Sequence, residues 1–536
     1  MTALSAKLHA IFSLKKRTTL LVKSSMINAG KFESIDSDSD ASRLTEKELL
    51  LDKFEITDAY TEGYVSLLDR AIIVVVRIAG SVYMFFAMWL VLILWIVLGI
   101  IYKAPSTWQI LMQDGQSIQT YAWDTLLMRQ QLDDSDSFLK LYGRLKSRYI
   151  THRRLFNMIM EKKNRRKSAG EKAGQADSGV AERTLVTDLA VASPSCVDIA
   201  LPPENWFDRL CSFFSRCLGS LPSVLIYWMG IFIWIACGNL YSPTGNEAPF
   251  TGRTTGSNPE YSKWNNTWQM YINTAIAVEL LITSVLLENV RNRNDRYVRK
   301  QMQKLSVLDC KIEGMSRYVT GDMEDNEVVE IPPVKRTGLK RVISIYADVI
   351  GTGIGLVISL CVFAVWLAIG PTMKWNSNWW LIIGTYTGLV GFIDGFTLRE
   401  VYYSITHYEE ERFMELLTDS QELLDIAGIN YTLRKPVEQR TISYKMSAFM
   451  NRICSNQWSV VASLVAVVLV ICIASGMRWS LTGQLICNTP TMIIEGFCLL
   501  ILIQAHNWAD YKRRFIVKEL AISREVLYER LGELIG

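Results

Sequence analysis

The chain has 536 residues, of which 50% are hydrophobic, 11% aromatic and 21% charged, a balance that excludes a disordered chain, a collagen and a small disulfide scaffold. The formal net charge of +4 is too small to indicate a nucleic-acid partner, and four histidines are few for a zinc enzyme. The ten cysteines form no C-x-x-C pair, so we interpret them as small hydrophobic residues.

Residues 1–70 form a polar N-terminal region that lacks the features of a signal peptide. Lys15, Lys16 and Arg17 are not followed by an apolar core and a small-residue cleavage site. We expect this region to lie in the cytoplasm, because basic residues favour that side of a membrane.

Long apolar runs dominate the rest of the chain. Four uncharged runs are long enough to cross a ~30 Å hydrocarbon core, namely 78–101, 222–241, 349–370 and 457–476. Each is followed by a more polar run, at 108–128, 267–290, 379–405 and 483–508. This order predicts an all-α polytopic membrane protein of about eight transmembrane helices, with hairpins at 71–128, 221–290, 348–406 and 455–508.

Lysine and arginine are concentrated outside the short links within these hairpins. Of the 57 in the chain, only Lys103, Arg253, Lys263, Lys374 and Arg478 lie in those links, at 102–107, 242–266, 371–378 and 477–482. Both termini and the basic links 129–220, 291–347 and 407–454 should therefore be cytoplasmic. The hairpin tips should face outside, where Asn265 begins a glycosylation sequon.

The cytoplasmic segments differ in composition. Residues 168–200, within the link 129–220, are rich in Ala, Gly, Ser and Asp and predict a partly disordered linker. Residues 408–428 predict a charged helix, and residues 509–536 a C-terminal helix.

The polar runs contain an internal repeat. Thr267-Trp268-Gln269 followed by Asn273-Thr274 corresponds to Thr482-Gly483-Gln484 followed by Asn488-Thr489. The first run has Thr107-Trp108-Gln109 and Gln113-Asp114, and the third has Trp379-Trp380 and Gly384-Thr385. Because each repeat contains two helices, all four share one orientation, which favours a pseudo-four-fold bundle with the polar helices inside. A two-by-two packing without a central pore fits the same pattern.

Four carboxylates recur, one in each polar run. Glu279 and Glu495 should lie near the middle of the membrane, and Asp124 and Asp394 closer to the cytoplasm. An ionisable group in the bilayer is costly, so these residues are candidates for an ion path. Asp124 and Asp394 could instead pair with Arg129 and Arg399.

Amide, hydroxyl and imidazole groups accompany these carboxylates: Gln269, Gln484, Asn273, Asn488, Thr274, Thr489 and His506. Such a donor set suits Fe²⁺, Mn²⁺ or Zn²⁺ better than Cu(I). The alternatives are that the amides bond helices together and that His506 is interfacial. We interpret the stripe Gly384, Gly388, Gly391 and Gly395 as close helix packing and the tryptophans at the hairpin tips as an aromatic belt.

The second and fourth hairpins resemble the low-affinity iron permease family. The resemblance rests on Thr267-Trp268-Gln269 through Asn273-Thr274 and Glu288-Asn289, and on Asn488-Thr489, Glu495-Gly496 and Gln504-Ala505-His506-Asn507. It departs at Glu288, where the family has Gln, and at Gln113-Asp114 and Gly384-Thr385, where it has Asn-Thr. The resemblance implies a plasma-membrane Fe²⁺ transporter, with zinc, copper or manganese as lesser substrates and no ATP hydrolysis.

Three functions remain open at this stage. The first is a channel-like permease driven by the membrane potential, the second a proton-coupled metal carrier, and the third a non-transporting scaffold or receptor. None is an enzyme, and none needs a resident cofactor. The expected partners are the lipid bilayer and the transported metal, and the chain could act alone or as a homo-oligomer.

Overall fold

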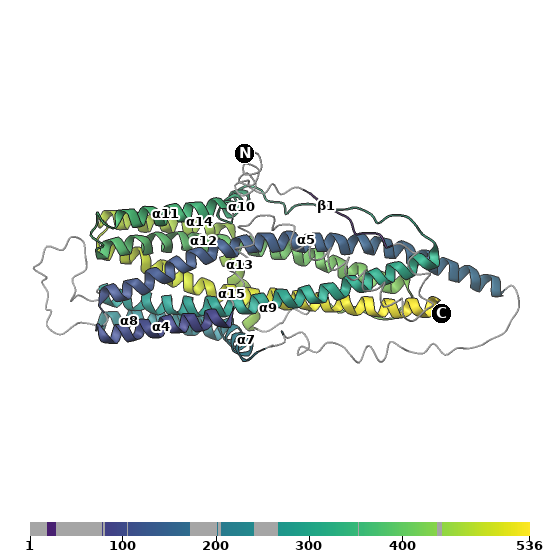
Figure 1. Ribbon diagram of the computed structural model, residues 1–536, viewed down its shortest axis with the longest axis horizontal. Coiled ribbons are helices and arrows are strands. Elements are labelled where there is room, and N and C mark those ends of the chain that lie inside the picture. Colours follow the sequence, from purple (N-terminus) through teal and green to yellow (C-terminus); the bar gives the residue numbers. More distant parts are fainter. Residues whose placement is uncertain are drawn as a thin grey trace, which may run out of the picture.

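The computed structural model describes residues 19–27, 78, 81–103, 105–171, 201, 205–240, 266–351, 353–436 and 442–535. Four long helices form its frame: α5 (Ser106–Glu171), α9 (Asn266–Thr320), α12 (Ser377–Ile426) and α15 (Leu481–Ile535). They pack against one another along the long axis of the molecule (Figure 1). At 1.5 Å per residue they are far longer than a bilayer requires, so each should extend well beyond it.

A shorter apolar helix precedes each long helix. These outer helices are α4 (Val82–Ile101), α8 (Leu221–Leu240), α11 (Gly353–Ile369) and α14 (Gln457–Gly476), and all lie beside the N-terminal halves of the long helices (Figure 1). Their surface is apolar and largely uncovered: Leu90, Phe232 and Leu469 are 68%, 62% and 58% exposed. A surface of this kind suits contact with lipid.

Six described helices are long and apolar enough to cross a membrane: α4, α8, α9, α12, α14 and α15. The first turns of α5 are more polar, with Gln109, Gln113 and Asp114, and the apolar part of α11 is shorter. These findings confirm the expectation of a mainly helical chain with several helices long and apolar enough to cross a membrane. The number eight stays a prediction.

Three further helices stand where the outer helices begin. We call them the collar helices: α7 (Trp206–Leu218), α10 (Leu339–Ile350) and α13 (Ile442–Cys454). Two residues separate each of them from the outer helix that follows. Figure 1 places all three at one level, where the outer helices give way to the long helices alone.

The C-terminal halves of the long helices form a second packed region. The predicted charged helix 408–428 and C-terminal helix 509–536 are continuations of α12 and α15, and much of the links 129–220 and 291–347 continues α5 and α9. The helices continue because their apolar positions keep a helical spacing and share one core, which includes Phe156, Leu305, Leu423 and Leu527. Most of the predicted disordered linker 168–200 lies outside the described residues.

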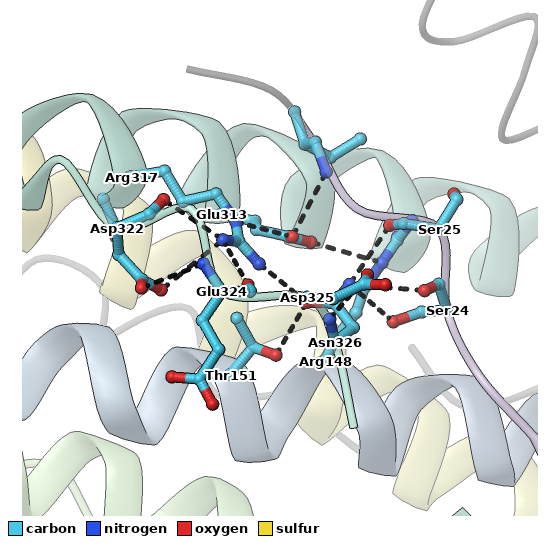
Figure 2. A network of polar contacts seen from close by, with 12 residues as sticks. Ser24, Ser25, Arg148, Thr151, Glu313, Arg317, Asp322, Glu324, Asp325 and Asn326 are labelled. Atoms are coloured by element: carbon cyan, nitrogen blue, oxygen red, sulfur yellow. Dashed lines mark hydrogen bonds and ion pairs between the residues drawn. The ribbon is translucent and has the colours of Figure 1, made fainter. Parts of the chain in front are cut away.

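A short strap fastens the N-terminal segment to this bundle. Strand β1 (Leu20–Val22) pairs antiparallel with β2 (Val329–Ile331). Asn326 donates from Nδ2 to Ser24 Oγ at 3.0 Å and accepts at Oδ1 from Arg317 at 2.9 Å (Figure 2). The buried Arg317 also binds Glu313 Oε1 at 3.0 Å, so the strap is tied to charged groups inside the bundle.

Candidate functional site

Tryptophan pairs align the long helices with the outer helices. Trp95 donates from its indole nitrogen to the Trp108 carbonyl at 3.1 Å, and Trp108 donates to the Trp95 carbonyl at 2.7 Å. The same reciprocal pair joins Trp234 with Trp268, and Trp366 with Trp379. In the fourth hairpin Gly483 stands at the tryptophan position. These tryptophans thus fix the start of three long helices, a role the aromatic-belt interpretation did not include.

An apolar ring lies two residues beyond these positions. It consists of one residue from each long helix: Ile110, Met270, Leu381 and Leu485. All are buried, with exposures of 1%, 3%, 1% and 0%. One residue from each long helix, each two positions after the tryptophan position of its motif, therefore meets the others in a single buried cluster.

Buried polar side chains lie beside the ring, one residue before it at Gln109 and Gln484 and three to six residues after it elsewhere; we call them the oxygen layer. Each of its members has at least one buried oxygen without a hydrogen-bond partner: Gln109, Gln113, Asp114, Gln116, Asn273, Thr385, Gln484, Asn488 and Thr489. An unsatisfied buried acceptor costs about 1–3 kcal/mol. Buried acceptors without a hydrogen-bond partner offer favourable contacts to a cation, which would satisfy several oxygens at once.

The glycine stripe of α12 makes room for this layer. A Cβ on Gly384 would lie 2.4 Å from Asp114 Oδ1, and one on Gly388 would lie 2.7 Å from Asn488 Oδ1. One on Gly391 would lie 3.8 Å from both oxygens of Glu495. The absence of side chains at these glycines therefore lets polar groups of α5 and α15 approach the α12 backbone, which packing alone would not predict.

Deeper along the bundle the four long helices enclose a cavity of about 80 Å³. Asp124 of α5 and Glu495 of α15 both line it, so the structure brings together two of the four predicted carboxylates. Glu288 of α9 and Arg399 of α12 line the same cavity. The cavity can hold a partly hydrated ion beside two carboxylates that come from different repeats.

The other two predicted carboxylates lie outside the lining of this cavity. Asp394 is 1% exposed; its Oδ1 accepts from the Tyr346 hydroxyl of α10 at 2.6 Å, and its Oδ2 has no partner. Glu279 is half-buried and lies near Tyr227 of α8. Glu279 does not line the cavity because the next residue along α9, Leu280, occupies the side of the helix that faces it.

The remaining predicted residues divide between the oxygen layer and helix contacts. Asn273, Asn488, Gln484 and Thr489 belong to the oxygen layer, whereas Thr274 accepts from Gln113 Nε2 at 3.0 Å. Gln269 is half-buried at the start of α9. His506 is buried, with its ring 4.2 Å from that of Tyr402 and Nε2 unpartnered. Asn265 lies outside the described residues.

Comparison with known proteins gives the same assignment as the motifs. The model of the family described as "Low affinity iron permease" matches residues 443–533, which span α13, α14 and most of α15. The chain is 47% identical to the "Low-affinity Fe(2+) transport protein" of Saccharomyces cerevisiae, over 86% of this chain and 82% of that protein. The chain belongs to the low-affinity iron permease family.

A second relative supports this assignment to the iron permeases. The chain is 39% identical to the "Low-affinity iron/zinc ion transport protein fet4" of Schizosaccharomyces pombe, over 88% of this chain and 74% of that protein. No solved structure matches the chain.

The site of this iron permease includes residues that sequence reasoning did not select. Asp114 was visible as an acidic residue inside the repeat motif, whereas nothing in the sequence marked the contact of Tyr346 with Asp394. Among the described residues there is no group of three or more His, Cys, Asp or Glu side chains close enough to hold a metal ion. The polar groups that the structure gathers are mainly amide and hydroxyl oxygens with separate carboxylates.

Proposed function

We propose that the chain is a low-affinity Fe²⁺ permease that conducts the ion between its four long helices. The observation that carries this proposal is the oxygen layer. All four long helices contribute to it buried oxygens that have no hydrogen-bond partner. Most of these ligands are neutral amide and hydroxyl oxygens, which bind an ion loosely. Loose binding suits passage rather than storage. The membrane potential supplies ~2.3 kcal/mol per charge per 100 mV, enough to drive a divalent cation inward without a pump.

We propose three stages for the path. The ion passes the apolar ring, exchanges water for oxygens of Asp114, Asn273 and Asn488, and then enters the cavity beside Glu495 and Asp124. Asp394 stands beyond, and Glu279 adds negative charge from the flank. These oxygen donors suit other divalent ions too, so zinc, manganese and copper are proposed as lesser substrates.

The topology belongs to the same proposal. Each long helix with its outer helix forms one hairpin, which gives eight spans in four parallel repeats around a pseudo-four-fold axis. The four-membered apolar ring and the three reciprocal tryptophan pairs support this repeat. The basic links place both termini in the cytoplasm, and the resemblance suggests the plasma membrane.

The test is uptake of radiolabelled Fe²⁺ by the purified full-length protein in liposomes with an inside-negative potential. Wild type should accumulate iron, and Asp114→Asn combined with Glu495→Gln should not, although it folds and inserts. Gly115→Ala is the control, because a Cβ at Gly115 meets nothing within 4 Å. Normal uptake by the double variant would refute the site, and no uptake by wild type would refute transport.

A proton-coupled carrier is the second candidate. Asp124 and Glu495 share one cavity, so one of them could carry a proton when no metal is bound. An opposed pH gradient should then accelerate uptake in the same liposomes. If uptake at constant Fe²⁺ activity does not depend on the pH gradient, the proton-coupled carrier is excluded and the permease is the remaining candidate.

A further inference from the structure

The collar helices repeat one arrangement three times. Each is 12 or 13 residues long, and each leads after two residues into an outer helix that is apolar throughout. In Figure 1 they share the level at which the outer helices end. If the outer helices cross the membrane, three helices at this level stand at the boundary between its hydrocarbon core and water.

Their outward faces combine apolar and basic side chains. The apolar ones include Trp206 of α7, Val342 of α10 and Phe449 of α13, which are 58%, 61% and 59% exposed. Each helix also exposes two basic residues: Arg209 and Arg216, Lys340 and Arg341, and Lys445 and Arg452. Exposed apolar and basic side chains on one helix are typical of helices that lie among lipid headgroups.

We infer that the collar helices bind anionic phospholipids of the inner leaflet. The apolar side chains continue the exposed apolar surface of the outer helices, and the six basic residues complement negative headgroups. A basic residue near an anionic membrane surface contributes about a five-fold gain in binding. The inference rests on the orientation in the proposed function, which puts the collar on the cytoplasmic side.

The inward faces of the collar helices bind polar groups of the long helices. Tyr346 of α10 donates to Asp394 at 2.6 Å, and Ser215 Oγ of α7 donates to Asn507 Oδ1 at 2.9 Å. Ser447 of α13 accepts from Gln504. All three contacts meet the long helices toward the cytoplasmic end of the ion path. Lipid bound to the outward face of α10 would therefore hold this helix in the position in which Tyr346 contacts Asp394. We expect bound lipid to increase the rate of uptake.

The lipid site is tested with the purified full-length protein. Wild type is reconstituted in phosphatidylcholine with phosphatidylserine and then extracted in detergent, and the retained phosphatidylserine is counted by native mass spectrometry. Lys445→Gln with Arg452→Gln should retain several-fold less. The matched control is Lys162→Gln with Arg165→Gln, two exposed residues near the far end of α5. Equal retention by the two variants would overturn the site.

The coupling is tested by Fe²⁺ uptake in vesicles with and without phosphatidylserine. Wild type should be several-fold faster with the anionic lipid, and the Lys340→Gln, Arg341→Gln variant, which removes the exposed charges of α10, should lose that difference. Tyr346→Phe should bind the lipid normally and yet lose the difference. Equal wild-type rates in the two vesicles would overturn the coupling. Absence of uptake in both would refute the proposed function, while lipid retention would still decide the site.

Discussion

The carboxylate of Asp114 on α5 lies against the backbone of Gly384 on α12, where a Cβ would come within 2.4 Å of Oδ1. Real Cβ atoms do not tolerate such a distance, so Gly384→Ala must displace Asp114 or separate the two helices. We expect Gly384→Ala to lower Fe²⁺ uptake at least ten-fold, which corresponds to about 1.4 kcal/mol. Uptake and surface expression are measured together, with Gly115→Ala as the control. Normal uptake would mean that the Asp114 carboxylate has no part in the path.

The four carboxylates should contribute unequally, although they occupy related places in the sequence. Glu495 lines the cavity, whereas Glu279 lies outside its lining beside α8. We expect Glu495→Gln to reduce uptake about ten-fold or more and Glu279→Gln to reduce it only about two- to three-fold, as a distant charge does in a partly polar surrounding. Uptake is measured over a range of Fe²⁺ concentrations. A larger loss in Glu279→Gln would reverse the assignment.

The sequence predicts those features of the fold and site that depend on neighbouring residues, and it fails for contacts between residues far apart in the chain. Hydropathy predicted the apolar helices, and the motif beginning at Thr267-Trp268-Gln269 pointed to several polar residues that the structure buries, among them Asn273, Asn488 and Gln484. Leu280, not Glu279, lies eleven residues after Gln269, so Glu279 is one position off the helical face that Gln269 and Asn273 share. The contact of Tyr346 with Asp394 spans 48 residues and two helices, and no local pattern encodes it. The extension of α12 past the membrane was also missed, because a charge-rich segment resembles a separate helix when its packing partners are unknown.

The apolar ring should limit the rate at which ions enter. The ring consists of Ile110, Met270, Leu381 and Leu485, whose side chains offer no oxygen ligand. Such an apolar constriction excludes water and therefore opposes the entry of a hydrated ion. Leu485→Ser should hydrate it and raise uptake several-fold at saturating Fe²⁺, with some loss of selectivity against Na⁺. Leu485→Met, which keeps the ring apolar, is the control. Slower or unchanged uptake in a well-folded Leu485→Ser protein would place the rate-limiting barrier elsewhere.

His152 should make the second packed region, formed by the C-terminal halves of the long helices, sensitive to acid. Its side chain is completely buried, with Nε2 3.2 Å from the Asp309 carbonyl oxygen. Burial is the main cause that lowers the pKa of His152 to about 4; Arg524 and Arg148 lower it further, while Asp309 opposes them. Because the unfolded chain binds a proton near the usual pKa of about 6.5, the free energy of unfolding should fall as pH drops from there to about 4. Above pH ~7 His152 is neutral in both the folded and the unfolded chain, so it does not make the free energy of unfolding depend on pH.

The expected loss from His152 is at most about 3 kcal/mol, from ~1.4 kcal/mol per pKa unit. It is measured by urea unfolding of the full chain in detergent at several pH values, with spectroscopic probes in the second packed region. His152→Asn lacks the titrating group, so its stability should depend less on pH than that of wild type between pH ~6.5 and ~4. Other titrating groups act alike in both proteins, and the difference therefore isolates His152. Identical pH profiles would show that His152 takes up its proton without unfolding the bundle.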